Sequence, residues 1–347
     1  MSAVMLSVLS GCDSRPVYPL HVEGSALLSS KGDTVVLRGI SYGWHNLGPH
    51  LYNSSSVKNI LKTSGSNLLR FSMGVDDLTG PDGNVAEGYL SNPSLGWKCI
   101  TECTDAAIRE GAYVIIDWHS HEIHRKEAIA FFDAVSRLYS GVPNVIYEIF
   151  NEPVNDSWHD VKAYSEAVID AIRANAPEAV ILVGTPHWDQ DIDLAVADPI
   201  KNRTNIMYTV HFYAGTHGQE LIAKADKALE KKVPVFISEC GAMESTGRGD
   251  FAWESWEQWL SWADKHSISM ALWSFSDMEE TCSMLLPSAK ERGGWGDGEF
   301  SEWGIYSRSF VGDYAKKMPI ARPTKEELKQ MAAEKEAEPE SDDKSTK

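Results

Sequence analysis

In Ile149-Phe150-Asn151-Glu152-Pro153, and again in Val235-Phe236-Ile237-Ser238-Glu239-Cys240-Gly241, an apolar run typical of a buried β-strand leads to a glutamate. Burying an ionised carboxylate costs free energy unless the group has partners. Strands that only filled a core would not end in this way, so we interpret Glu152 and Glu239 as a pair of working carboxylates at strand ends. The alternative is two unrelated glutamates in surface ion pairs.

Runs of the same kind recur along most of the chain and alternate with amphipathic stretches. Their density in Val, Ile, Leu and aromatic residues, without strict alternation, is typical of parallel strands buried on both faces. This order predicts an α/β protein made of a single (β/α)8 TIM barrel, preceded by a short hairpin over Leu20–Leu37. An open doubly wound sheet would need a glycine-rich phosphate loop after its first strand, and the sequence has none. The strand-like runs are Val35–Tyr42, Asn67–Met73, Tyr113–Trp118, Val145–Phe150, Val180–Gly184, Ile206–Phe212, Val233–Ser238 and Met270–Phe275.

The composition limits the partners of the protein. The chain has 347 residues, and its 32 basic and 50 acidic residues give a net charge of -18. Such a charge disfavours nucleic acids and anionic membrane surfaces, because binding phosphate requires a basic patch. Twelve tryptophans are present; some belong to the core, and others are candidates for platforms on which the C–H faces of sugars stack. We expect a monomer.

Both ends of the chain differ from the barrel. Residues 1–19 are interpreted as a signal and linker, because Met1–Leu9 is mostly apolar and Leu9-Ser10-Gly11-Cys12 resembles a bacterial lipoprotein signal in which Cys12 would be lipidated. The apolar run is short and has no basic residue before it. We expect an exported protein, secreted or attached to the cell envelope, with its catalytic domain over residues 20–320. Residues 321–347 are expected to form a charged, disordered tail with a solvated helix over Glu326–Glu338.

The remaining cysteines show no spacing that suits zinc or a disulfide. Cys99 and Cys103 lie four residues apart on an expected helix, a poor geometry for a disulfide. No Cys/His cluster has the spacing of a zinc site. We therefore predict that these two, Cys240 and Cys282 are free thiols, and that the protein needs no metal.

Polar and aromatic residues gather where the expected strands end. In a barrel of this type the carboxyl ends of the strands form the active site. Two carboxylates on either side of a sugar ring, one an acid and the other a nucleophile or base, are what glycoside hydrolysis requires. The candidate residues are Arg70, His119, Asn151, Glu152, His211, Tyr213, Glu239 and Trp273.

With its Asn151-Glu152-Pro153 motif and this set in strand order, the chain from about residue 20 to 318 resembles family 5 glycoside hydrolases of the cellulase type (cellulase family A). The resemblance implies a retaining endo-β-1,4-glucanase without a cofactor, with Glu152 as acid/base and Glu239 as nucleophile. Glu152 would need a raised pKa, whereas Arg70 and Tyr213 would keep Glu239 ionised.

The same resemblance gives roles to the other residues. Asn151 would hold the sugar 2-hydroxyl, His119 and His211 would contact the sugar or orient the glutamates, and Trp273 would form the floor at the point of cleavage. Leu286-Pro287 appears where relatives often carry a Lys-Pro that contacts a glycone-side sugar. Possible further aromatic platforms are Trp44, Trp188, Trp295 and Trp303, of which Trp295 is favoured; His121, His124 and His187 are interpreted as ordinary loop histidines.

Three alternatives stay open at this point. The same fold and glutamates serve enzymes that act on mannan, xyloglucan, lichenan or xylan, and contacts with single hydroxyls decide between them. A non-catalytic surface protein that binds glycans would keep the aromatic platforms without needing both carboxylates. A metal-dependent hydrolase would use His119-Ser120-His121, which lie too close together for two inward ligands on one strand.

Overall fold

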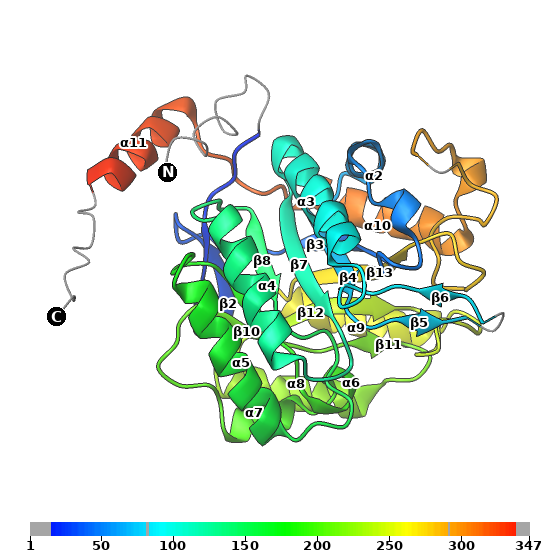
Figure 1. Cartoon of the computed structure of the whole chain (residues 1–347), viewed down its shortest axis with the longest axis horizontal. Coiled ribbons are helices and arrows are strands. Elements are labelled where there is room, and N and C mark those ends of the chain that lie inside the picture. Colours follow the sequence, from blue (N-terminus) through cyan, green and yellow to red (C-terminus); the bar gives the residue numbers. More distant parts are fainter. Residues whose placement is uncertain (1–14, 81–82, 291, 338–347) are drawn as a thin grey trace.

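The computed structural model describes residues 15–80, 83–290 and 292–337, and these fold around one closed parallel sheet (Figure 1). The sheet has the order β10-β9-β8-β7-β4-β3-β13-β12-β11, and pairing of β10 with β12 closes it. This confirms the predicted (β/α)8 barrel. The strands are β3 (Arg38–Tyr42), β4 (Leu68–Gly74), β7 (Tyr113–His119), β8 (Val145–Glu148), β9 (Ile181–Val183), β10 (Ile206–Thr209), β11 (Phe212–Tyr213), β12 (Val235–Gly241) and β13 (Met270–Phe275).

Helices surround the sheet, and local signals set their ends (Figure 1). The side chain of Asn53 caps the first of them by accepting the N–H groups of Ser55 and Ser56, and Gly65 ends it in a left-handed conformation with φ of 66°. The longer helices are α2 (Ser54–Ser64), α3 (Pro93–Glu110), α4 (Arg125–Leu138), α5 (Trp158–Arg173), α8 (Gln219–Glu230), α9 (Trp253–Lys265) and α10 (Glu302–Lys317), with α6 (Pro186–Asp189) and α7 (Ile192–Ala197) between β9 and β10.

The N-terminal hairpin closes one end of the barrel. Strands β1 (Leu20–Glu23) and β2 (Ala26–Ser29) pair antiparallel, as the sequence predicts. Leu20 and Leu27 belong to a buried apolar cluster that also contains Leu68 and Tyr113, the first residues of β4 and β7. Because the hairpin fills the end at which the strands begin, any opening for a ligand lies at the other end.

The C-terminal segment returns to the same end as the hairpin. Helix α11 (Lys325–Ala337) is present where a solvated helix is predicted, so this part of the charged tail is helical rather than disordered. The Glu327 carboxylate explains the order, since it accepts hydrogen bonds from the Thr324 N–H (2.9 Å) and the Tyr18 hydroxyl (3.0 Å) and pairs with Lys31 (2.5 Å). Residues 338–347, and Cys12 with the signal-like segment, lie outside the described residues.

One further expectation concerns the cysteines. Cys99, Cys103, Cys240 and Cys282 are buried and free, as predicted. Within residues 15–80, 83–290 and 292–337, no helix has the length and apolar character needed to cross a lipid bilayer.

Candidate active site

The predicted site residues converge at the carboxyl end of the barrel. Two adjoining hollows open there, with volumes of about 230 and 850 Å³, and both are lined by Glu152, Glu239 and Tyr213. Trp44 and Trp273 line the smaller hollow, whereas the larger one extends past Trp188. The two glutamates therefore lie in the middle of a groove with room on both sides.

Arg70 on β4 is the centre of a buried ionic network. Its guanidinium is fully buried and makes two hydrogen bonds to the Glu148 carboxylate, of 2.7 and 3.1 Å. It also donates to Glu239 Oε2 (3.0 Å) and Asn151 Oδ1 (2.6 Å), and it lies 2.9 Å from Asp117 Oδ2. One cation thus faces three carboxylates and fixes the side chains of β4, β7, β8 and β12 relative to one another.

Glu239, on β12, is held at both carboxylate oxygens. The Tyr213 hydroxyl donates to Oε1 at 2.6 Å, while Arg70 donates to Oε2. Burial and the negative charge of Glu152 raise the pKa of Glu239, although His211, Arg70 and the Tyr213 hydrogen bond act in the opposite direction. The Glu239 carboxylate is therefore fixed in orientation, and the negative charge of Glu152 disfavours its ionised form.

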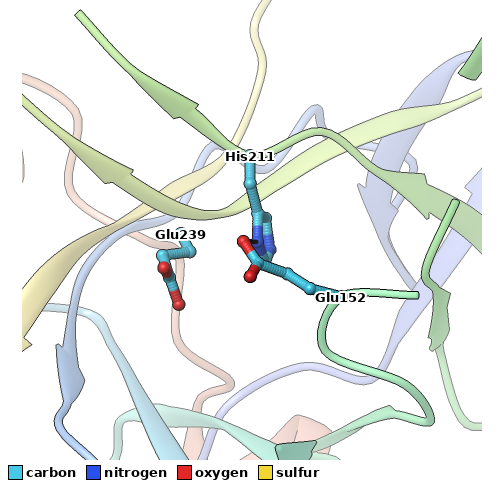
Figure 2. A group of neighbouring side chains, drawn as sticks. All are labelled: Glu152, His211 and Glu239. Carbon is cyan, nitrogen blue, oxygen red and sulfur yellow. Dashed lines mark hydrogen bonds and ion pairs between the residues drawn. The ribbon is translucent and has the colours of Figure 1, made fainter. Parts of the chain in front are cut away.

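Glu152 lies in the loop after β8, between two imidazoles. Its Oε1 is 2.9 Å from His211 Nδ1, and its Oε2 is 3.3 Å from His121 Nε2. Figure 2 shows the Glu152 carboxylate against the His211 ring, with Glu239 extending toward the same space from β12. An oxygen of each glutamate and a ring nitrogen of His211 lie within 4.8 Å of one another, which matches the short separation of roughly 5–5.5 Å between the carboxyl groups of retaining glycosidases.

The pKa expected of Glu152 is wrong for this arrangement of side chains. Burial raises the pKa, but the hydrogen bonds from His121 and His211 outweigh it and lower the pKa of Glu152 to about 2. The sequence indicates burial of the glutamate but not the two imidazoles that point at it. The expected order, with Glu152 raised and Glu239 held down, is reversed in the structure.

The proton for the acid step can reside on His211. The Ser238 hydroxyl donates to Glu148 (2.7 Å), so Ser238 accepts a hydrogen bond from His211 Nε2–H (2.8 Å). The Nδ1 of His211 then shares one transferable proton with Glu152. Although burial lowers the pKa of His211, the charge of Asp189 and the hydrogen bonds to Glu148 and Glu152 raise it well above its ordinary value. Glu152 and His211 therefore titrate as a unit.

His119 is a neutral wall of the site. Its Nδ1 lies 2.6 Å from Asp117 Oδ2, and its ring stacks on Trp273 with centroids 5.3 Å apart and an interplanar angle of 5°. Trp44 meets the ring edge-on at 4.3 Å. Burial, followed by the charge of Arg70, lowers the pKa of His119 well below its usual range. A neutral imidazole that donates its Nδ1–H to Asp117 can accept a hydrogen bond at Nε2 without adding charge to the groove.

The candidate platforms fall into two groups. Trp44 and Trp188 line the groove, and Trp188 is 42% exposed. Trp295 and Trp303 are buried, so their interpretation as platforms is wrong. They lie behind β13: Trp295 packs on Phe275 with centroids 5.1 Å apart, and Trp303 donates its indole N–H to the Trp273 carbonyl at 2.6 Å. These two residues support the wall of the groove from behind.

Several residues of the site were missed or dismissed in the sequence. Glu148, Asp117 and Asp189 are fully buried around Arg70 and His211. Glu148 and Asp117 each interrupt an apolar strand, the same signal that marks Glu152 and Glu239. The sequence predicts an ordinary loop histidine at His121, but this residue contacts Glu152. That contact depends on loop geometry that no local pattern encodes.

A metal is a poor match to these side chains. Glu152, His211 and Glu239 are of types that bind metal ions, and their atoms are close enough for it. Both ring nitrogens of His211 already have protein partners, and both oxygens of Glu239 accept hydrogen bonds. The donors fit a hydrogen-bonded acid/base pair better than a coordination sphere.

A (β/α)8 barrel with two such carboxylates in a central groove is the architecture of a glycoside hydrolase. Residues 28–279 match the family model described as cellulase (glycosyl hydrolase family 5). The chain belongs to glycosyl hydrolase family 5.

Similar proteins include bacterial endoglucanases. The chain is 39% identical over 291 residues to endoglucanase Z of Dickeya dadantii and 37% identical over 301 residues to endoglucanase A of Evansella cellulosilytica. These matches cover 82% and 84% of this chain, and 66% and 59% of the relatives, so the chain spans about two thirds or less of their length.

Solved structures agree with the fold. A structure from Cytophaga hutchinsonii superposes with a TM-score of 0.82 at 38% identity, covering 87% of this chain and 97% of that one. The catalytic domain of Thermobifida fusca endoglucanase Cel5A, as a variant in complex with cellotetraose, gives a TM-score of 0.78 at 28% identity and covers 84% of this chain and 96% of that one.

Proposed function

We propose that this chain is a retaining endo-β-1,4-glucanase that cleaves internal bonds of cellulose and related β-glucans. The observation that carries the proposal is the close approach of Glu152 and Glu239 in the middle of the groove, within 4.8 Å. The endoglucanase names of similar proteins and the cellotetraose complex of one of them support the substrate class. Room on both sides of the glutamates suits a polymer that passes through the site.

The reaction runs in two displacements. In the first, a Glu239 oxygen attacks the anomeric carbon, the glycosidic C–O bond breaks, and Glu152 gives the leaving oxygen the proton that it shares with His211. In the second, Glu152 takes a proton from water, the water oxygen attacks the anomeric carbon, and the bond to Glu239 breaks. The fixed orientation of Glu239 between Arg70 and Tyr213 favours attack from one face of the sugar.

The sugar at the point of cleavage finds its partners in the wall of the groove. Asn151 uses its amide oxygen to bind Arg70, which leaves its buried amide nitrogen without a partner among the described residues. That N–H₂ group is suited to donate to the sugar 2-hydroxyl. Trp273 forms the floor, and Trp44 and Trp188 are the platforms on either side.

Single substitutions test the catalytic roles. Replacing Glu239 with Ala should lower activity on carboxymethylcellulose by several orders of magnitude, because a covalent catalyst is lost. Glu254→Ala, at an exposed glutamate of α9, is the matched control and should keep full activity. A loss of less than about tenfold in Glu239→Ala would overturn the assignment. Binding of cellohexaose by the wild type without release of reducing ends would instead indicate a non-catalytic glycan-binding protein.

The choice among β-glycans is tested with a panel of purified polymers. We expect cellulose derivatives to give cello-oligosaccharides faster than mannan, xyloglucan, lichenan or xylan gives products. A higher kcat/KM on one of the latter polymers would move the assignment to that substrate while leaving the mechanism in place.

Export and lipid attachment through Cys12 are also part of the proposal. The signal-like Leu9-Ser10-Gly11-Cys12 supports them, and the described chain begins at the closed end of the barrel, which would leave the groove facing away from a membrane. Membrane fractionation of a producing bacterium tests this: wild type should sediment with membranes and Cys12→Ser should not. Equal release of both would refute lipid attachment. We expect a monomer by gel filtration.

A further inference from the structure

A strained turn carries Trp188 into the groove. His187, Trp188 and Asp189 have φ values of 59°, 54° and 59°, all in the left-handed region that residues with a side chain rarely adopt. Three such residues in succession persist only where the surroundings hold them. The Trp188 N–H donates to the Pro153 carbonyl at 3.1 Å, so the turn is fastened to the residue that follows Glu152.

The Asp189 side chain fastens the turn from inside. It is fully buried, and its Oδ1 accepts the Thr185 N–H at 2.6 Å, which closes the turn on itself. Its Oδ2 lies 2.5 Å from the Thr209 hydroxyl at the end of β10. The proposed reaction gives this buried acid no direct part, so its place in the fold requires another explanation.

The same carboxylate also faces the acid/base. Asp189 Oδ2 lies 3.3 Å from His211 Nε2, and His211 Nδ1 lies 2.9 Å from Glu152. The other titratable groups that act on this histidine are Glu148 on β8 (3.6 Å), Glu239 on β12, Asp117 and His119 on β7, and His217. Burial raises the pKa of Asp189 well above its ordinary value, while the charge of His211 and the hydrogen bonds from Thr209 and Thr185 act in the opposite direction. Asp189 is thus the acidic group that reaches His211 from the side of the Trp188 turn, and it is negatively charged when it faces a protonated His211.

Trp188 lines the same hollow as His211, the partner of Glu152, and the acid/base must face the leaving group. We propose that Asp189 is a positioning residue that joins this aglycone-side platform to the acid/base. Its carboxylate holds the left-handed turn that presents Trp188 to the leaving part of the glucan, and it keeps the proton of the Glu152–His211 pair available. The inference rests on the proposed endoglucanase activity. Binding of the leaving group at Trp188 and its protonation by Glu152 therefore both depend on the buried side chain of Asp189.

The test compares two substrates with different needs. Cellohexaose requires both the platform and the proton, whereas 2,4-dinitrophenyl β-cellobioside carries a leaving group that needs neither. The variants are Asp189→Asn, which keeps the shape and can still accept the Thr185 N–H, and Asp189→Ala, which loses the turn contacts. Trp188→Ala removes the platform alone. Asp193→Asn is the matched control, because it removes a carboxylate on α7 that pairs with Lys224 and is not among the groups facing His211.

We expect Asp189→Asn to lower kcat/KM on cellohexaose about tenfold and to change the aryl cellobioside less than about threefold. Loss of the negative charge beside His211 should also move the alkaline limb of the cellohexaose profile to lower pH by about one unit. Asp189→Ala should show the same effects and also a higher KM for cellohexaose. Trp188→Ala should raise the KM for cellohexaose but leave the pH profile unchanged. The control should match the wild type on both substrates.

Two results would overturn the inference while leaving the activity established. One is an Asp189→Asn enzyme with the wild-type substrate ratio and pH profile, and the other is an equal loss on both substrates, which a purely structural role would give. A wild-type enzyme that hydrolyses neither substrate would instead refute the proposed function.

Discussion

Replacing Arg70 with Met should lower both stability and activity, because one guanidinium is in contact with three buried acidic groups. Methionine has a similar length but leaves Glu148, Asp117 and Glu239 without their cation. Removing one partner of a buried ion pair typically costs about 3–5 kcal/mol. With about 2.1 cal/mol/K of unfolding entropy per residue over roughly 320 residues, a loss of about 4 kcal/mol corresponds to a fall in Tm of about 6 °C.

The pH dependence of this loss has a definite sign. Burial raises the pKa of Glu148 in the wild type, but Arg70 and His211 outweigh it and the pKa is lowered. The stability that Glu148 contributes is therefore present above its ordinary pKa and is lost as pH falls through the lowered value. Without Arg70, the buried carboxylates destabilise the folded state while they are ionised, and this destabilisation disappears when they take up protons. The difference in Tm between wild type and Arg70→Met should be largest near pH 8 and shrink toward pH 5.

The assay is thermal unfolding followed by circular dichroism from pH 5 to 8, together with kcat/KM on an aryl cellobioside. Arg38→Met is the matched control, since Arg38 is equally buried but pairs with Asp264, which is 51% exposed. The control should lose stability by a similar amount at each pH and keep kcat/KM within about threefold, whereas Arg70→Met should lose at least about a hundredfold. A Tm deficit in Arg70→Met that does not change with pH, or activity equal to that of the control, would refute the reasoning.

Three further predictions concern the pKa values of the two glutamates and the metal dependence of the activity. Tyr213→Phe removes a 2.6 Å hydrogen bond that lowers the pKa of Glu239, so the acid limb of kcat/KM should move to higher pH and kcat should fall about a hundredfold; an unchanged acid limb would contradict it. His121→Ala removes a hydrogen bond that lowers the pKa of Glu152, so the alkaline limb should move to higher pH, measured on cellohexaose; movement the other way would show a different role. EDTA should leave activity on carboxymethylcellulose unchanged after dialysis, and a loss restored by a divalent cation would revive metal dependence.

Periodicity and strand-end residues were enough to predict the barrel and the convergence of its catalytic residues. Eight buried runs in alternation with helices permit few closed arrangements, and the carboxyl ends of parallel strands must meet at one end. Asn151, after β8, and Glu239, near the end of β12, follow that rule, whereas Arg70 is the third of the seven residues of β4 and reaches the site with its long side chain. A hairpin before the barrel was predictable from its short apolar runs, but its turn was not: Gly24-Ser25 joins β1 to β2, whereas Lys31-Gly32-Asp33, the expected turn, lies after β2.

Loop conformation and burial behind the strands were not predictable in the same way. Trp295 and Trp303 follow β13, the strand that carries Trp273, yet the chain folds back and buries them. His121 reaches Glu152 only because the loop after β7 turns over the groove. The pKa order of Glu152 and Glu239 depends on His121 and His211, so naming candidate residues did not yield their charges.

The central claim is that Glu239 forms the covalent bond to the sugar while Glu152 handles the proton. Incubation with 2,4-dinitrophenyl 2-deoxy-2-fluoro-β-cellobioside, followed by proteolysis and mass spectrometry of the peptides, tests it most directly, because the fluorine slows breakdown of a glycosyl-enzyme. We predict one added 2-fluorocellobiosyl group, on Glu239, and none in Glu239→Ala. A label on Glu152, or the absence of any label in an enzyme that hydrolyses cellohexaose with inversion, would contradict the account.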